Sequence, residues 1–374
     1  IDMDKKDCLT LQSQTFDWLR FPLIVCVVFI HNPCRPALNF EEIVSGSFSM
    51  MSCYNLIRVV LTYVLTHIAV PAFYVISGYL FFYNIKIWNF DIYKTKIKKR
   101  FHTLIIPYIL WNVIAYALLF GVVLVKNICT GDWNGDFSLS LDIFWNYYSW
   151  KSGYDWLGNE IIHTAPINLP LWFLRDLIVL SILSPLLYWL VTRFKYYFIA
   201  ILFFLYISGF SFQISGFDVT ALFFFCLGAY FSINGLCILQ FTKRIPYIPW
   251  IAAILLMLTV LYGGKSSMTG SLIYPFYIIT GVISAFGLSS CLLRSGKVTV
   301  NHFLTSSVFF IYAIHTINGM NLCNLDSVYL GNNPLILLPV YLITPIIKIA
   351  VGLGIFWLMK RYTPKILGFL IGER

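Results

Sequence analysis

Long stretches of apolar residues follow one another along this chain, separated by short polar segments. Because the stretches are continuous rather than alternating, the pattern predicts helices and argues against a β-barrel. The predicted helices cover 17–32, 56–83, 104–126, 171–192, 196–212, 218–239, 247–263, 271–293, 303–322 and 335–359. Since a helix needs roughly 20 apolar residues to cross a bilayer, we expect an all-α, polytopic integral membrane protein with about ten transmembrane helices.

The composition agrees with this pattern. Of the 374 residues, 59% are hydrophobic and only 11% are charged, whereas a soluble domain contains about 25% charged residues. This excludes a water-soluble domain. We expect one transmembrane domain over residues 1–374, with no soluble domain appended after the last helix.

The distribution of Lys and Arg gives the chain an orientation. If the N-terminus is cytoplasmic, the inner segments hold 18 of these residues and the outer loops hold four, which are Arg35, Lys126, Lys151 and Lys265. The positive-inside rule then places both termini in the cytoplasm. The net charge of +10 follows from this topology, and no nucleic-acid partner is needed to explain it. We expect no cleaved signal peptide, because no small-residue cleavage site follows the first apolar run.

Ionisable residues inside predicted helices are informative, since a charge at bilayer depth costs several kcal/mol. In the first helix Arg20 and His31 are eleven residues apart, which is about three turns and about 16 Å, so they share one face. Asp17 can pair with Arg20, and His31 could simply be a polar cap at the outer end. A neutral imidazole in this position would equally suit a general base that faces an intramembrane cavity.

A basic loop is expected at 84–103, just before the third helix. It contains Lys98, Lys99, Arg100 and His102. Juxtamembrane basic clusters orient membrane proteins and contact anionic headgroups. Ammonium and guanidinium groups also match phosphate oxygens, so the loop could bind a phosphorylated cosubstrate. Composition alone leaves both interpretations open.

Four further side chains could line a cavity. Ser77 is one of them, although it lies beside Gly78, where small residues could instead let two helices pack closely. Tyr312 and His315 are three residues apart and could form a simple polar pair within one helix. The four candidates are Ser77, Trp172, Tyr312 and His315.

The nine cysteines form no CxxC motif. Those inside predicted helices are expected to behave as inert, small apolar residues; they are Cys26, Cys226, Cys237 and Cys291. Cys34 and Cys53 both fall in the first outer loop, so they could form a disulfide, but the odd total leaves this open.

Taken together, the chain resembles the membrane-bound acyltransferase family 3. The resemblance extends over essentially the whole chain and depends on the order of its motifs. They are Arg20 with His31, YVISGYLFF at 74–82, KIKKRFHTLIIPY at 96–108, PLWFL at 170–174, FFFCLGAYF at 223–231, IYAIH at 311–315 and LIGER at 370–374.

The resemblance implies an activity. Members take an acyl group, commonly acetyl, from cytoplasmic acyl-CoA and transfer it to a hydroxyl group of a glycan, a lipid-linked sugar or a related small acceptor. The implied partners are therefore acyl-CoA, a carbohydrate acceptor and membrane lipid, with no metal ion. The expected location is the bacterial inner membrane. The oligomeric state, the acceptor and the length of the acyl chain are not specified by the sequence.

The resemblance also assigns residues. His31 matches the essential histidine of the first helix, and Arg20 matches its arginine partner. Arg100 matches the first arginine of the family's Arg-x-x-Arg element, but Thr103 occupies the second position. Other basic groups would then have to help bind the CoA phosphates, namely Lys98, Lys99 and His102.

The implied chemistry centres on His31, as the general base for the acceptor hydroxyl or as a transient acyl carrier. Arg20 is about three turns away toward the cytoplasm. It is therefore expected to bind the pantetheine or pyrophosphate region, or to hold Asp17, rather than to stabilise an oxyanion. Two other classes stay open, a transporter or flippase for a lipid-linked glycan and a lipid-binding sensor. Binding of acetyl-CoA would distinguish the enzyme from both.

Overall fold

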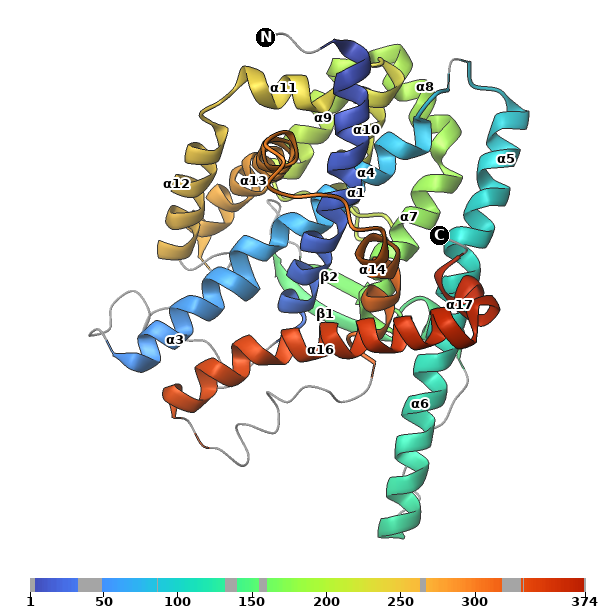
Figure 1. The fold of residues 1–374 in the computed structure, drawn as a ribbon, viewed down its shortest axis with the longest axis vertical. Coiled ribbons are helices and arrows are strands. Elements are labelled where there is room, and N and C mark those ends of the chain that lie inside the picture. The colour runs from blue at the N-terminus through green and yellow to red at the C-terminus, as the bar shows by residue number, and fades with distance from the viewer. Residues whose placement is uncertain are drawn as a thin grey trace.

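The computed structural model describes residues 4–32, 49–85, 87–131, 140–154, 160–262, 267–317, 331 and 333–372. In these ranges the ordered elements are helices and one two-stranded β-hairpin. Figure 1 shows the helices gathered in one bundle, in which α1 (Lys5–Ile30) begins beside the N-terminus and α6 (Ile106–Thr130) reaches beyond the other helices at one end. The predicted all-α class is confirmed in its main feature.

The first half of the chain forms helices on both sides of two irregular turns. After α1 come α3 (Met50–Arg58), the π-helical turn η1 (Val59–Val64), the 3₁₀ turn η2 (Leu65–Ile68), α4 (Ala69–Phe82), α5 (Phe90–Arg100), the π-helical turn η3 (Phe101–Ile105) and α6. The segment that follows contains η4 (Leu141–Phe144), β1 (Tyr148–Tyr154) and β2 (Glu160–Ala165).

The second half consists of shorter helices and two long ones. In order these are η5 (Leu169–Leu171), α7 (Trp172–Ile182), α8 (Ser184–Phe194), α9 (Tyr196–Ile207), α10 (Val219–Ile233), α11 (Ile238–Arg244), α12 (Ile248–Leu261), α13 (Met268–Arg294), α14 (His302–Ile314), α16 (Pro334–Tyr362) and α17 (Pro364–Ile371).

Several of these helices could cross a membrane. Among the described residues, five helical stretches are long and apolar enough, which are Lys6–Ile30, Met50–Phe82, Phe90–Thr130, Met268–Arg294 and Pro334–Tyr362. The number rises to seven if two bent helix pairs each count as one span, and α9, α12 and α14 are shorter apolar helices. The chain is thus a multi-pass membrane protein, whereas the count of ten spans stays a prediction.

Three details differ from the sequence-based expectation. The expected loop at 84–103 is helical from Phe90, because the Asn89 side chain caps α5 by accepting a hydrogen bond from the Ile92 amide at 2.8 Å. The helix expected at 171–192 bends by 68° between α7 and α8, where Pro185 lacks the amide that would continue the helix. The helix expected at 218–239 bends by 101° beside Gly235, whose φ is +61°.

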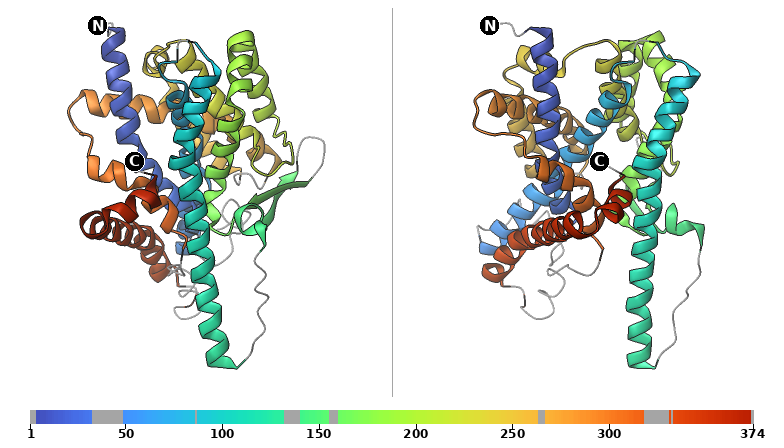
Figure 2. Two further views of the ribbon diagram at one scale, coloured as in Figure 1. Left: turned by 90° about the vertical axis from the view of Figure 1, so that its right-hand side faces the viewer. Right: turned by 45° about the vertical axis from the view of Figure 1, so that its right-hand side comes forward.

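The β-hairpin lies in the segment between α6 and α7, where the sequence predicted no helix. Its strands are antiparallel, with Tyr148 opposite Ala165 and an irregularity between Lys151 and Gly153. Figure 2 shows the hairpin beside the helix bundle. The guanidinium of Arg175 in α7 attaches it to the bundle, since it donates to the carbonyl of Trp145 at 2.7 Å and to the carbonyl of Thr164 at 3.0 Å.

The tightest helix contact joins α4 to α10. Gly78 of α4 lies against the carbonyl group of Phe225, and Gly228 of α10 lies against the carbonyl group of Val75. A Cβ atom on either glycine would overlap with backbone atoms of the other helix. The interpretation of Gly78 as a small residue that allows close packing is therefore confirmed.

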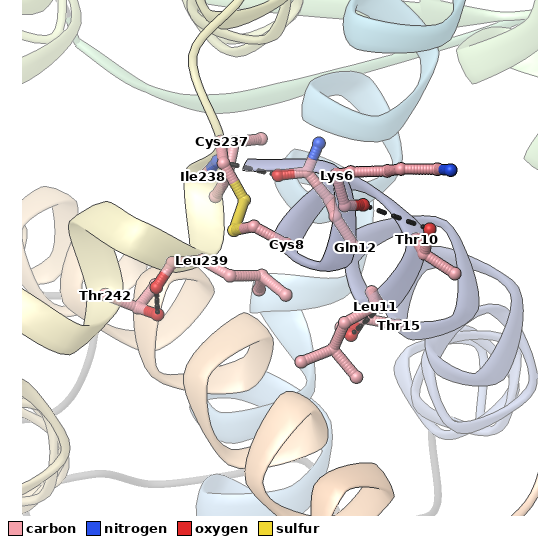
Figure 3. The surroundings of a disulfide bond; sticks show 10 residues. All are labelled: Lys6, Cys8, Thr10, Leu11, Gln12, Thr15, Cys237, Ile238, Leu239 and Thr242. Atoms are coloured by element: carbon pink, nitrogen blue, oxygen red, sulfur yellow. Dashed lines mark hydrogen bonds between the residues drawn. A yellow bond between two sulfur atoms is a disulfide. The ribbon is translucent and has the colours of Figure 1, made fainter. Parts of the chain in front are cut away.

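A disulfide links the beginning of α1 to the turn between α10 and α11. Cys8 and Cys237 form it, with their Cα atoms 6.5 Å apart (Figure 3). Beside it, the Gln12 side-chain oxygen accepts a hydrogen bond from the amide of Ile238 at 2.6 Å. The expectation that Cys237 is inert was wrong. It lies in the turn between α10 and α11 and meets Cys8, which precedes the helix predicted at 17–32.

The other cysteines partly agree with the expectation. Cys26, Cys226 and Cys291 carry free thiols, as predicted. Cys53 is also free. A disulfide between Cys53 and Cys34 is not described, because Cys34 lies outside the described residues.

Candidate active site

The structure brings together two histidines from opposite ends of the chain. His31 follows the last turn of α1, and His315 follows the last turn of α14. The centres of their rings are 5.2 Å apart, and the ring planes are inclined by 47°. His31 is half-buried, whereas His315 is only 2% exposed. The sequence indicated both residues separately but not that they meet.

The hydrogen bonds of His315 determine which of its nitrogens carries the proton. Its Nδ1 lies 2.8 Å from the carbonyl oxygen of Tyr312 and 3.2 Å from that of Ile311. A carbonyl oxygen only accepts hydrogen bonds, so Nδ1 is the protonated nitrogen and Nε2 has a free lone pair. Among the described residues, Nε2 is buried without a hydrogen-bond partner. The ring therefore presents an unpaired acceptor inside the bundle.

A buried lysine adds positive charge to this site. Lys348 of α16 is 3% exposed, and its charge acts on the rings of both His31 and His315. Helix α16 contacts both α1 and α14. It is also linked to the end of α1, because the side-chain amide of Asn32 donates to the carbonyl of Tyr341 at 3.0 Å. No role was predicted for Lys348 from the sequence.

The segment before α7 fixes the end of α14 and hence the position of His315. The Tyr312 hydroxyl donates a hydrogen bond to the carbonyl of Pro170. Next to this contact, the side-chain amide of Asn168 donates a hydrogen bond to the carbonyl of Ala313 at 3.0 Å. The side-chain oxygen of the buried Asn112 of α6 in turn accepts a hydrogen bond from the backbone N–H of Asn168 at 3.1 Å. Sequence reasoning missed both asparagines, although an Asn within an apolar helix and another beside PLWFL were visible signals.

An aromatic path leads away from this site along α4. The ring of Phe173 lies 6.1 Å from that of Tyr312 and 6.1 Å from that of Phe73 in α4. Phe73, Ser77 and Phe81 follow at intervals of four residues, so they lie on one face of α4. Ser77 is half-buried within this row. Trp172, the first residue of α7, is also half-buried and packs against the hydrophobic core.

The row of aromatic residues ends beside the basic helix α5. The guanidinium carbon of Arg100 lies 5.1 Å from the centre of the Phe81 ring, and the ammonium of Lys96 lies 5.7 Å from it. Arg100 is half-buried. By contrast, three of the predicted partners are exposed, namely Lys98, Lys99 and His102. Lys96 thus joins Arg100 on the inner face of α5, a grouping that the basic run alone did not reveal.

Arg20 lies apart from the imidazole pair. It forms an ion pair with Asp17, with Nη1 and Oδ1 3.2 Å apart. The carbonyl of Asp17 also accepts a hydrogen bond from the Thr305 hydroxyl at 3.3 Å. The expected pairing with Asp17 is confirmed.

The chemical character of the site follows from its groups. Two imidazoles and an ammonium group can exchange protons and stabilise negative charge. No cluster of three His, Cys, Asp or Glu residues that could hold a metal ion is present in the described ranges. An apolar groove of about 670 Å³ between α9 and α13 contains none of the candidate residues.

Comparisons with known proteins agree with this chemistry. A family model for the acyltransferase domain matches residues 14–358, a range that includes both histidines. The chain is 26% identical over 376 residues to the succinoglycan biosynthesis protein ExoH of Rhizobium meliloti (strain 1021), an alignment that covers 97% of this chain and 92% of ExoH. No solved structure matches. The protein belongs to acyltransferase family 3 and is a membrane-bound acyltransferase.

Proposed function

We propose that the protein, as one transmembrane acyltransferase domain, moves an acyl group from acyl-CoA to a hydroxyl group of a polysaccharide or of its lipid-linked precursor. Acetyl is the proposed group. The observation that carries the proposal is the pair of His31 and His315 inside the bundle, 5.2 Å apart, in a chain of an acyltransferase family. The relative named for succinoglycan biosynthesis supports a polysaccharide acceptor.

The donor binds from the side of α5 in this proposal. Arg100 and Lys96 have the charge and position to bind the phosphates of CoA, because both lie at the inner face of α5 against Phe81. Exposed basic groups extend the same surface toward the nucleotide, namely Lys98, Lys99 and His102. The pantetheine arm then follows the aromatic row on α4 toward the histidines, with Ser77 and Trp172 as lining residues.

At the histidine pair, His31 acts as general base. It takes the proton of the acceptor hydroxyl while the oxygen attacks the thioester carbonyl. The new C–O bond forms, the C–S bond breaks, and the proton passes from His31 to the departing thiolate of CoA. The products are an ester and the free CoA thiol. Arg20 and its partner Asp17 support the helix that carries His31 rather than taking part in this step.

The proposed topology has both termini in the cytoplasm and the β-hairpin outside the cell, so donor and acceptor arrive from opposite sides. The exposed residues Lys99 and Lys151 mark the two sides. In a variant whose native cysteines are replaced, a membrane-impermeant maleimide added to intact cells should label Lys151→Cys. It should label Lys99→Cys only after lysis. Labelling of both positions in intact cells would contradict the orientation.

The activity is tested at His31. Surface polysaccharide from cells with the parent chain should contain acyl groups, seen by mass spectrometry, that are absent from cells without it. His31→Gln should lower this acylation by about 100- to 10,000-fold, the usual contribution of a general base. The matched control is His302→Gln, an exposed histidine at the start of α14, which should leave acylation unchanged.

Binding separates the enzyme from a transporter. Purified His31→Gln protein should fold and bind acyl-CoA as the parent does. If the parent does not bind acyl-CoA, and cells that lack the chain accumulate unexported glycan, the protein is a flippase instead. If His31→Gln retains acyl transfer within a few-fold of the parent, the role of His31 as base is wrong.

A further inference from the structure

His315 contains a buried polar atom that the proposed function does not yet use. Its Nδ1 proton is held by the carbonyls of Tyr312 and Ile311, so the ring cannot turn without losing those bonds. Its Nε2 lone pair has no hydrogen-bond partner among the described residues. A buried acceptor left unpaired destabilises the fold. A catalytic role is one of the known reasons for such a group in a native structure.

The ring of His31 can supply this partner. A nitrogen-to-nitrogen hydrogen bond of about 3 Å fits between two imidazoles whose centres are 5.2 Å apart, since each ring carries its nitrogens at the rim. The half-buried side chain of His31 lies at the end of a helix and can turn about its own bonds. The fixed ring of His315 cannot, so the hydrogen bond closes by rotation of His31.

We propose that His315 is a positioning residue for His31: its Nε2 accepts a hydrogen bond from one ring N–H of His31. This inference rests on the proposed function and adds a second residue to the same site. With that N–H directed at His315, the other nitrogen of His31 carries the lone pair. It therefore faces the acceptor hydroxyl as a base, in a single tautomer.

The arrangement follows the logic of an oriented base. Where a histidine removes a proton, a second acceptor on its other nitrogen fixes its tautomer and its direction. Here that acceptor is a neutral imidazole rather than a carboxylate. Among the described residues, buried Lys348 of α16 also acts on both rings with its positive charge. When His31 takes up the hydroxyl proton, the hydrogen bond to His315 Nε2 persists until the proton passes to the thiolate.

Two substitutions separate positioning from a purely structural role. In His315→Asn the side-chain amide replaces Nδ1, so it can keep the bonds to the Tyr312 and Ile311 carbonyls but offers no acceptor at the Nε2 position. In His315→Gln the longer side chain places its oxygen near the Nε2 position. If His315 only binds the carbonyls at the end of α14, the protein should tolerate His315→Asn better than His315→Gln. If His315 positions His31, the protein should tolerate His315→Gln better than His315→Asn.

The first measurement reads the tautomer directly. Nitrogen-15 NMR of histidine-labelled protein in nanodiscs should show His31, one of six histidines, as a single neutral tautomer in the parent. The His31→Gln variant identifies its signals. In His315→Asn we expect a mixture of both tautomers, and in His315→Gln a return to one. An unchanged His31 tautomer in folded His315→Asn protein would overturn the inference, whatever the activity.

The second measurement reads transfer. At equal protein levels, acylation of surface polysaccharide should fall by about tenfold or more in His315→Asn, part of what a general base contributes, and should stay within a few-fold of the parent in His315→Gln. Equal losses in both folded variants would overturn the inference. If the parent itself acylates nothing, the proposed function fails, and the tautomer measurement alone decides the role of His315.

Discussion

Gly78 of α4 lies directly against the backbone carbonyl of Phe225 in α10, with no room for a side chain between the two helices. The contact is reciprocal, because Gly228 of α10 meets α4 in the same way. Helix α4 also carries the aromatic row from Phe81 to Phe73, so its packing on α10 determines where that row lies relative to the histidines.

Replacing Gly78 or Gly228 by Ala should therefore destabilise the protein. The added methyl group must push two backbones apart, and overpacking of this kind typically costs about 1–3 kcal/mol. The thermal unfolding midpoint of the purified protein in detergent measures the effect. Gly121→Ala in α6 and Gly354→Ala in α16 are matched controls, since a Cβ there meets nothing within 4 Å. Equal melting temperatures for Gly78→Ala and the controls would contradict the packing argument.

Arg100→Ala should weaken the binding of CoA. A hydrogen bond from a charged group contributes about 1.5–3 kcal/mol, which corresponds to a roughly 10- to 100-fold higher Kd. Isothermal titration at low and high salt measures the affinity for CoA. Added salt should weaken CoA binding by the parent more than by the variant, because salt screens the Arg100–phosphate contact that the variant lacks. Lys243→Ala serves as the control, because Lys243 is an exposed lysine of α11 that takes no part in the proposed CoA site. A larger loss in Lys98→Ala than in Arg100→Ala would shift the phosphate site to the outer face of α5.

Arg175→Ala should release the β-hairpin from the bundle. The substitution removes the hydrogen bonds to Trp145 and Thr164 and takes away the cation 3.5 Å from buried Asp176. Breaking a buried ion pair on one side costs about 3–5 kcal/mol. Hydrogen–deuterium exchange should become faster in both strands, while Arg193→Ala, on the exposed end of α8, should leave it unchanged. Unaltered exchange in the strands would show that another contact holds the hairpin.

Cys8→Ser should remove the covalent link between α1 and the turn after α10. The bond joins two residues that are 229 apart in sequence, and a disulfide typically stabilises a protein by about 2–4 kcal/mol. Because the proposed topology places Cys8 on the reducing, cytoplasmic side, peptide mapping of purified protein after mild oxidation should find Cys8 joined to Cys237 in the parent. Cys129→Ser, which replaces an exposed free cysteine, controls for the loss of a thiol. Recovery of both peptides as free thiols after the oxidation would contradict the bond.

The helices could be predicted from the sequence because each apolar run reflects a local property of the chain. The same is true of the ion pair between Asp17 and Arg20, which are three residues apart on one helix. The bend before Pro185 was visible in principle, but the apolar run passes through it without interruption. Hydropathy therefore locates helices and does not show where they change direction.

The relations between distant residues could not be predicted in this way. His31 and His315 were each identified by their place in a motif, yet nothing in the pattern states that α1 and α14 end side by side. Lys348 was assigned no role for the same reason. Cys8 precedes the predicted first helix and Cys237 lies at the end of another predicted helix, so their pairing depends on how α11 folds back. Contacts of this kind depend on how distant helices pack, and the order of apolar and polar residues along the chain does not record that packing.

The disulfide at Cys8 has a consequence for how the enzyme can move. Helix α1 is attached to the α10–α11 turn at one end and to α16 through Asn32 at the other. These contacts oppose sliding of α1 along its axis, and they therefore favour a constant depth of His31 in the membrane. We therefore expect that an opening for the acyl donor or the sugar comes from movement of the helices around α1 rather than from movement of α1 itself.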